Sequence, residues 1–305
     1  MEAERQLPVG NEIFLDHVAH WVRDADAASE AMIRAGFAPT PISIQTNPGP
    51  GGTSVPAGTG NVTAMMTRGY IEVLFKTSDT PQTREFDAGL ARYAGLHLIA
   101  FSVADARAAS QRLAASGFRT APIVALRRPV ATQTGTAEAA FTVARVEPGE
   151  MAEGRIQYLT HHTEDSVWQK RWLAHPNGAK QLIDVVVAVG DVDEAAGRYA
   201  RFTGRRPAAT QLGRSFMLDR GGVQLLEASS FSRLVPGVPI PNLPFIGAYA
   251  VRVESLIGAV SVLRARGTNF EQRDSMLFVP FPVSLGTGAW IFVEQPGDLP
   301  WRAKS

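Results

Sequence analysis

The chain has 305 residues, of which 45% are apolar and 19% are charged, and this length and composition are typical of a globular protein with about two domains. Thirty Lys plus Arg against 29 Asp plus Glu leave a formal charge of +1, which argues against nucleic acid as a partner. Because the chain has no cysteine, any bound metal would need His, carboxylate or amide ligands.

No segment has the length of a membrane span or the pattern of a secretory signal. The longest nearly apolar run, residues 182–190, is far shorter than the roughly 20 residues that cross a bilayer. The first residues are acidic and lead into no apolar core. We therefore expect a cytoplasmic protein that does not bind membranes.

One unit recurs along the chain. Residues 13–24 read as a strand that ends at Asp24, residues 27–35 have helical character, and Gly36 with Phe37 closes the unit. The unit returns over residues 96–118, where Asp105 is well placed as a helix N-cap. Two further copies cover residues 182–204 and 248–267. The four closing glycines are Gly36, Gly117, Gly204 and Gly267.

Strand-like segments follow each helix and predict the order βαβββ. In the first copy they are residues 62–66 and 70–75, and the hairpins indicate an α+β fold. One helix covers only one face of such a sheet, so the units are expected to pair into two curved-sheet cups. We predict a first pair at residues 11–165, a connector at 166–180 and a second pair at 181–296.

The order of these motifs resembles the vicinal oxygen chelate superfamily, in particular its glyoxalase-like branch. The resemblance rests on Leu15-Asp16-His17-Val18, Asp24, Gly36-Phe37, Gly58-Thr59-Gly60-Asn61 and Tyr70-Ile71-Glu72-Val73. This superfamily includes glyoxalase I, ring-cleaving dioxygenases, hydroxyphenylpyruvate dioxygenase, epimerases, metal-dependent thiol transferases and metal-free drug-sequestering proteins. The resemblance therefore implies the fold and leaves the function open.

The resemblance implies a divalent metal inside the first cup, with His17 and Glu72 as ligands from the first and last strands of the first unit. Strand alternation places His17 on the same face as Trp21, and Glu72 on the same face as Tyr70. Nitrogen and oxygen ligands suit Zn, Ni, Mn or Fe. A direct hydrogen bond between His17 and Glu72 without metal is the alternative.

The second unit departs from the family pattern. Gln157 takes the position of Glu72, and His161 shares its strand face as a third ligand candidate. Leu98 instead of His97 aligns with His17, so His97 is predicted to point away from the cup as a partly exposed residue. His20 lies on the opposite strand face from His17 and is predicted to be structural.

The remaining candidates concern the walls of the cup. Trp21, Met65, Tyr70 and Phe75 are predicted to contact the substrate. The glycine-rich segments 49–53 and 58–61 are predicted to be loops over the cup. Arg127, Arg128 and Arg145 could bind a carboxylate or another anion, although a solvated surface is the more common place for arginine.

Two functions remain open. The first is a metal-dependent lyase or isomerase of glyoxalase type that acts on a small molecule with vicinal oxygens, with Glu72 and Gln157 as catalytic residues. The second is a metal-free protein that binds a small molecule in the same cup. A ring-cleaving dioxygenase is less favoured because no histidine follows His175. The chain is expected to be a monomer or a homodimer.

Overall fold

The computed structural model describes residues 5–49, 51, 53–80 and 83–302. The first four residues, and Pro50 and Gly52 of the first glycine-rich segment, lie outside the described residues. The predicted βαβββ unit is present four times, and the α+β prediction is confirmed. None of the described helices is both long and apolar enough to cross a membrane.

The first half of the chain holds two units and a helix between them. The first unit consists of β1 (Ile13–Val22), α1 (Ala25–Arg34), β2 (Ser43–Pro48), β3 (Ser54–Met65) and β4 (Tyr70–Lys76), and α2 (Thr83–Arg92) follows it. The second unit consists of β5 (Gly95–Val103), α3 (Ala106–Ala115), β6 (Val124–Thr132), β7 (Gly135–Arg145) and β8 (Arg155–His161). The short helices α4 (Glu164–Val167) and η2 (Lys170–Trp172) then lead to the second half.

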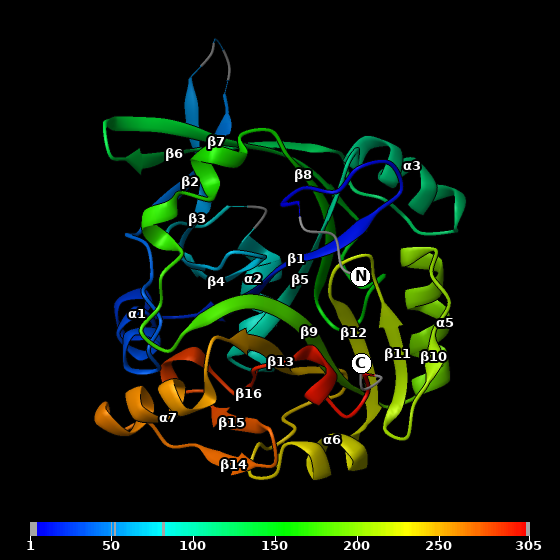
Figure 1. Cartoon of the computed structure of the whole chain (residues 1–305). Helices are drawn as coiled ribbons and strands as arrows, with labels where there is room; N and C mark the ends of the chain where they lie inside the picture. The colour runs from blue at the N-terminus through cyan, green and yellow to red at the C-terminus, as the bar shows by residue number, and fades with distance from the viewer. Residues whose placement is uncertain (1–4, 50, 52, 81–82, 303–305) are drawn as a thin grey trace.

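The second half repeats this order with shorter hairpins. The third unit consists of β9 (Ala179–Val189), α5 (Val192–Thr203), β10 (Ala208–Ala209), β11 (Gly213–Met217) and β12 (Gly222–Glu227), and α6 (Ala228–Leu234) follows it. The fourth unit consists of β13 (Phe245–Val253), α7 (Leu256–Ala265), β14 (Glu271–Arg273), β15 (Met276–Pro280), η3 (Val283–Leu285) and β16 (Ala289–Val293), before η4 (Pro296–Asp298). The helices α1, α3, α5 and α7 lie at the periphery, around the strands (Figure 1).

A side chain after the first strand caps the following helix in all four units, and it is an Asp in three of them and Ser255 in the fourth. The Asp24 carboxylate accepts a hydrogen bond from the Ala27 backbone, and Asp105 and Asp191 cap α3 and α5 in the same way. Such a side chain satisfies backbone N–H groups that have no partner within the helix. Gly204 ends α5 with a φ of 68°, a left-handed conformation that glycine adopts without steric cost. The helix boundaries therefore follow directly from local sequence.

The sheet closes in the first half and stays open in the second. In every unit the first and last strands pair in parallel, as β1 with β4 and β9 with β12. The strand order β1-β4-β3-β2-β6-β7-β8-β5 returns to β1, because β5 pairs antiparallel with β1. In the second half β9 pairs with β13, and among the described residues β10 and β14 end the sheet without pairing to each other. The first pair of units therefore forms a closed cup.

Two β-bulges interrupt the ladder between β1 and β5. Leu15 pairs with Phe101 and His17 with Ala100, so Asp16 is an extra residue in β1. Ala19 pairs with Leu98 and His20 with Leu96, so His97 is an extra residue in β5. A bulge locally breaks the alternation of side chains between the two faces. It therefore decides where Asp16 and His97 point, independently of strand periodicity.

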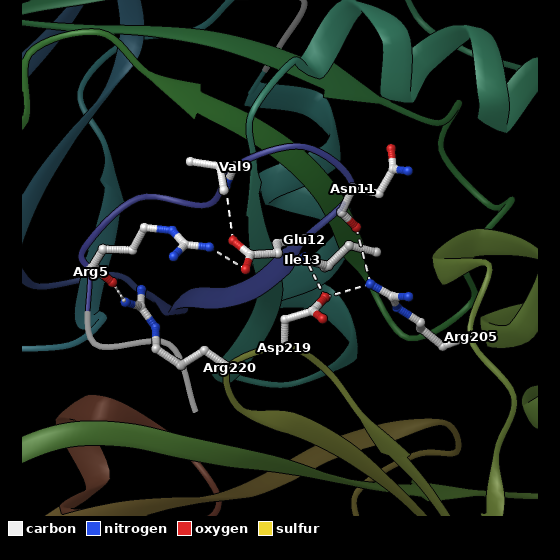
Figure 2. Close-up of polar contacts among 8 residues, drawn as sticks. All are labelled: Arg5, Val9, Asn11, Glu12, Ile13, Arg205, Asp219 and Arg220. Atoms are coloured by element: carbon white, nitrogen blue, oxygen red, sulfur yellow. Dashed lines mark hydrogen bonds and ion pairs between the residues drawn. The ribbon is translucent and has the colours of Figure 1, made fainter. Parts of the chain in front are cut away.

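The N-terminal segment ties the first unit to the third (Figure 2). The Asp219 carboxylate accepts a hydrogen bond from the Ile13 backbone N–H at 2.9 Å and pairs with the Arg205 guanidinium. Arg205 also donates to the Asn11 carbonyl at 3.0 Å, and Arg220 donates to the Arg5 carbonyl at 3.0 Å. Together with a pairing of β5 and β13, these contacts join the two halves. The exact residue limits of the two predicted domains stay a prediction.

Two sequence expectations are wrong. Residues 58–61 are part of β3 instead of a loop; the glycine at position 60 is explained by packing, because a Cβ there would lie 2.6 Å from the Phe75 ring. His97 is only 1% exposed. At its bulge it stacks on Tyr93, with ring centroids 4.1 Å apart, and hydrogen-bonds the Tyr93 carbonyl at 2.7 Å.

Candidate functional site

The closed cup contains a cavity of about 60 Å³, enough for several water molecules or the reactive part of a small ligand. Its polar lining includes the predicted residues His17, Glu72 and Gln157. The other lining residues are Gln45, Asn61, Tyr70, Leu74, Leu98, Leu126, Arg128, Phe141, Val143, Arg145, Arg155 and Leu159. The cavity therefore combines a cluster of polar groups with an apolar wall.

Asp16 connects two histidines behind this cavity. Its carboxylate is fully buried and accepts hydrogen bonds from His17 Nδ1 and from His161 Nε2, each at 2.8 Å. Burial opposes the ionisation of Asp16, but the charge of His161 and the hydrogen bonds from both histidines hold its pKa well below the usual value. An ionised Asp16 orients the His17 ring so that Nε2 faces the cavity.

His17 Nε2 faces the Glu72 carboxylate, with 3.7 Å between Nε2 and Oε2. The other carboxylate oxygen, Oε1, accepts a hydrogen bond from Asn61 Nδ2 at 2.6 Å. Tyr70 stacks on the His17 ring with centroids 4.4 Å apart. If His17 is neutral, its Nε2 and Glu72 Oε2 are two acceptors that face each other, which is favourable only with a proton, a cation or a hydrogen-bond donor between them.

Three arginines line the other side of the cavity. Arg145 Nε donates to Gln157 Oε1 at 2.9 Å, and Arg155 makes two hydrogen bonds to Glu85, at 2.9 and 2.6 Å. Arg128 makes no hydrogen bond or ion pair with another residue in the described part of the chain. Burial and, to a smaller extent, the neighbouring charge of Arg155 together lower the pKa of Arg145 to about 9, against the opposing effect of Glu85 and Glu72. With a pKa of about 9, Arg145 remains charged near neutral pH.

The other predicted site residues lie elsewhere. His161 does not line the cavity. Its ring is turned to Asp16 and packs on the Trp168 ring, with 4.7 Å between the ring centroids. Trp21 stacks on Phe86, and Phe75 packs against the main hydrophobic core. Met65 lines a neighbouring groove of about 400 Å³ whose wall also includes Arg128. Of the four predicted substrate contacts, Tyr70 is the one that lines the cavity itself.

Sequence reasoning missed Asp16 and Asn61. Regular strand alternation puts neighbouring residues such as Asp16 and His17 on opposite faces, and only the bulge in β1 brings the two side chains together. Asn61 lies opposite Leu74 in the pairing of β3 with β4, and it belongs to a segment that was interpreted as a loop. The one sequence signal for Asp16 was its position directly before the candidate ligand His17.

The donors that converge in the cavity are His17 Nε2, the Glu72 carboxylate and the Gln157 amide oxygen. Among the described residues, no group of three or more His, Asp or Glu side chains is arranged to hold a metal ion. The donor set still fits a divalent ion that takes an amide oxygen as its third ligand. Gln157 Oε1 accepts one hydrogen bond from Arg145 and has a second lone pair for the ion, and the Asp16 carboxylate orients the His17 ring. His161 does not belong to this donor set.

The second cup carries a different set of residues at the equivalent positions. Asp184 and Gln224 occupy the places of His17 and Glu72, since both Asp184 and His17 precede their helix cap by seven residues. Trp301 Nε1 donates to Asp184 at 2.7 Å, and Arg302 donates to both of its carboxylate oxygens at 2.8 and 2.9 Å. Trp301 and Arg302, the last two described residues, thus occupy the second cup at this position.

Comparisons with known proteins agree with this architecture. Residues 15–203 match the glyoxalase-like domain family. No curated protein matches the chain by sequence. A hypothetical protein from Staphylococcus aureus has a similar structure, with a TM-score of 0.63 at 10% identity, over 92% of this chain and 98% of that one.

Two further structures belong to proteins with named activities. A triple mutant of 4-hydroxymandelate synthase from Streptomyces coelicolor has a TM-score of 0.58 at 15% identity, over 92% of both chains. A fusion of a xylose isomerase-like TIM barrel with 4-hydroxyphenylpyruvate dioxygenase has a TM-score of 0.57 at 10% identity, over 95% of this chain and 50% of that one. At these identities the similarity extends to the fold alone.

Proposed function

The chain belongs to the glyoxalase-like domain family of the vicinal oxygen chelate superfamily, and we propose that its closed cup is the active site of a lyase or isomerase. The proposed reaction moves a proton on a small molecule with vicinal oxygens. One observation carries the proposal: Asp16 holds the His17 ring so that Nε2 faces the Glu72 carboxylate across 3.7 Å, inside a cavity. Facing groups of this kind are suited to proton transfer.

His17, Glu72 and Gln157 would hold a divalent ion in this site. When bound, such an ion supplies Lewis-acid polarisation of the substrate oxygens. The neighbouring carboxylate of Asp16 orients His17 for this role, as carboxylates commonly do for metal-binding histidines.

The protein residues have distinct tasks in the proposed reaction. Glu72 accepts the proton from the hydroxyl-bearing carbon next to a carbonyl and returns it to the carbonyl carbon, while the hydroxyl proton moves to the former carbonyl oxygen. Asn61 fixes one oxygen of Glu72 by its hydrogen bond of 2.6 Å, so the oxygen facing His17 is the one that exchanges protons. Leu74, Leu98 and Phe141 line the cavity and limit access of water to the exchanging proton.

An oxygenase reaction is less favoured by the geometry. Non-haem iron oxygenases hold their metal with two histidines and one carboxylate. The second candidate histidine, His161, donates to Asp16 and does not line the cavity, so this set is not assembled.

A metal-free binding protein is the second candidate function. Two observations favour it. Leu98 takes the position in the second unit that His17 has in the first, so no ligand stands there, and Gln157 already accepts a hydrogen bond from Arg145. The same cavity would then bind a small molecule without converting it.

Metal content and proton exchange distinguish these two functions. Protein purified without chelator is analysed for metal, and its uptake of Zn²⁺, Ni²⁺ and Mn²⁺ is measured by calorimetry. The enzyme proposal predicts about one ion per chain, lost in His17→Ala and retained in His162→Ala, whose histidine lies outside the cavity.

The chemistry is tested by NMR in deuterated water with a panel of small 2-hydroxy carbonyl compounds. The enzyme proposal predicts metal-dependent exchange of the carbon-bound proton, and a loss of about 100-fold or more in Glu72→Gln. A parent protein that takes up no ion and exchanges no proton in any compound would refute the enzyme proposal in favour of the metal-free one.

A further inference from the structure

Positive charge exceeds negative charge around the cavity of the first cup. Among the described residues, the lining contains three guanidiniums, Arg128, Arg145 and Arg155, and one carboxylate, Glu72. Glu85 outside the cavity pairs with Arg155 and neutralises it. On the arginine side of the cavity, three positive charges against these two carboxylates leave an excess of one; the carboxylate of Asp16 lies on the other side, bonded to His17 and His161.

Two of the guanidiniums keep hydrogen-bond donors for a ligand. Arg145 uses Nε for Gln157, and no hydrogen bond with the described residues engages its two terminal nitrogens. Arg128 engages no acceptor in the described part of the chain, and its half-buried side chain lines both the cavity and the adjoining groove. A partly buried guanidinium without a hydrogen-bond acceptor is unfavourable, so a site of this kind is stabilised by an anionic ligand.

The remainder of the lining restricts what carries the negative charge. Leu126, Phe141, Val143 and Leu159 form an apolar wall next to the arginines. A ligand that matches both features has one anionic group and a short apolar body. The excess of one positive charge matches a carboxylate better than a doubly charged phosphate.

We propose that the first cup recognises a small carboxylate, whose anionic group is held by Arg128 and Arg145 and whose apolar body contacts Leu126 and Phe141. This assignment rests on the proposed function, since it names the substrate class of the same site. It places the reacting atoms of the substrate at His17 and Glu72, and the carboxylate at the arginine side of the cavity.

The neighbouring arginines Arg127 and Arg128 provide a matched pair of variants. Adjacent residues on β6 face opposite sides, and Arg127 is exposed and paired with Glu138 outside the cavity. Benzoate and its neutral isostere benzamide are the probes. Their binding to the full-length protein is measured by calorimetry in the presence of EDTA, so that no divalent ion contributes.

The proposal predicts that benzoate binds to the parent protein about tenfold or more tightly than benzamide. Arg128→Met lowers the benzoate affinity by about 10- to 100-fold, Arg128→Lys recovers part of it, and Arg127→Met leaves it unchanged within about twofold. Benzamide binding is the same in all variants. Arg145→Met provides a second loss-of-charge variant should Arg128→Met fail to fold.

Equal affinity for benzoate and benzamide, or an equal effect of Arg127→Met and Arg128→Met, would overturn the proposal. Tighter binding of phenylphosphonate than of benzoate would overturn the assignment to a carboxylate. Because EDTA removes metal from these measurements, carboxylate binding without proton exchange refutes the enzyme function alone. Proton exchange without a preference for carboxylates refutes the carboxylate assignment alone.

Discussion

Two buried histidines outside the cavity predict that the fold loses stability in mild acid. His20 is fully buried and hydrogen-bonds the Leu285 carbonyl and the Tyr249 hydroxyl, each at 2.9 Å. His97 is buried against Tyr93. Burial lowers the pKa of each histidine to about 4, although the carbonyl hydrogen bonds oppose this shift. In the unfolded chain both would titrate near the ordinary value of about 6.5.

The sign and size of the effect follow from these values. Because the folded-state pKa lies below the unfolded one, acid protonates the unfolded chain first. The stabilising contribution is therefore complete above about pH 6.5 and is lost as the pH falls toward the folded-state pKa. Lowering the pH from about 7 to about 5 should reduce the free energy of unfolding by about 2 kcal/mol per histidine, or about 4 kcal/mol for the two together. A typical domain has a total stability of about 5–15 kcal/mol.

Urea unfolding at both pH values and constant ionic strength, followed by tryptophan fluorescence, measures this loss. The variant His97→Gln keeps an N–H donor for the Tyr93 carbonyl but does not titrate. It should be less stable than the parent near neutral pH and lose only about 2 kcal/mol on acidification. His162→Gln, a change at an exposed histidine, should lose as much as the parent. An equal acid-induced loss in His97→Gln and the parent would refute the reasoning.

Three further predictions concern stability near neutral pH, each measured by urea unfolding. Trp301→Ala should lower the free energy of unfolding by about 3–5 kcal/mol, because it empties the second cup. Trp301→Phe should lose mainly the hydrogen bond to Asp184 and lower it by about 1–2 kcal/mol. Equal losses in the two variants would contradict the packing role of Trp301. Asp219→Ala should cost about 1–2 kcal/mol by removing the acceptor of the Ile13 N–H, and an unchanged urea midpoint would contradict the role of the N-terminal contacts. Gly69→Ala should lower the free energy of unfolding by about 1–3 kcal/mol, because the φ of Gly69 is 72° and the added Cβ would lie 2.8 Å from a backbone oxygen of β1. An unchanged free energy of unfolding would show that the turn relaxes.

The fold could be predicted from the sequence because its signals are local and repeated four times. A capping side chain, a helix of 10 to 12 residues and a closing glycine occur in one order, as Asp24 and Gly36 illustrate in the first unit, and the cap is an Asp in three units and Ser255 in the fourth. Local hydrogen bonds and backbone conformation decide these features within about a dozen residues of sequence. The candidates His17, Glu72 and Gln157 follow from the family resemblance, supported by strand periodicity, and all three line one cavity.

Tertiary structure decided which other groups join them. A bulge turns Asp16 toward His17 and His161, although strand periodicity assigns Asp16 to the opposite face. Arg128 lines the cavity while Arg127 faces solvent, and the sequence alone does not distinguish the two arginines. Bulges and the closure of a sheet depend on how strands distant in sequence pair, so no local pattern encodes them. Local sequence therefore determined the repeating unit, and strand pairing between units determined the chemistry of the cavity.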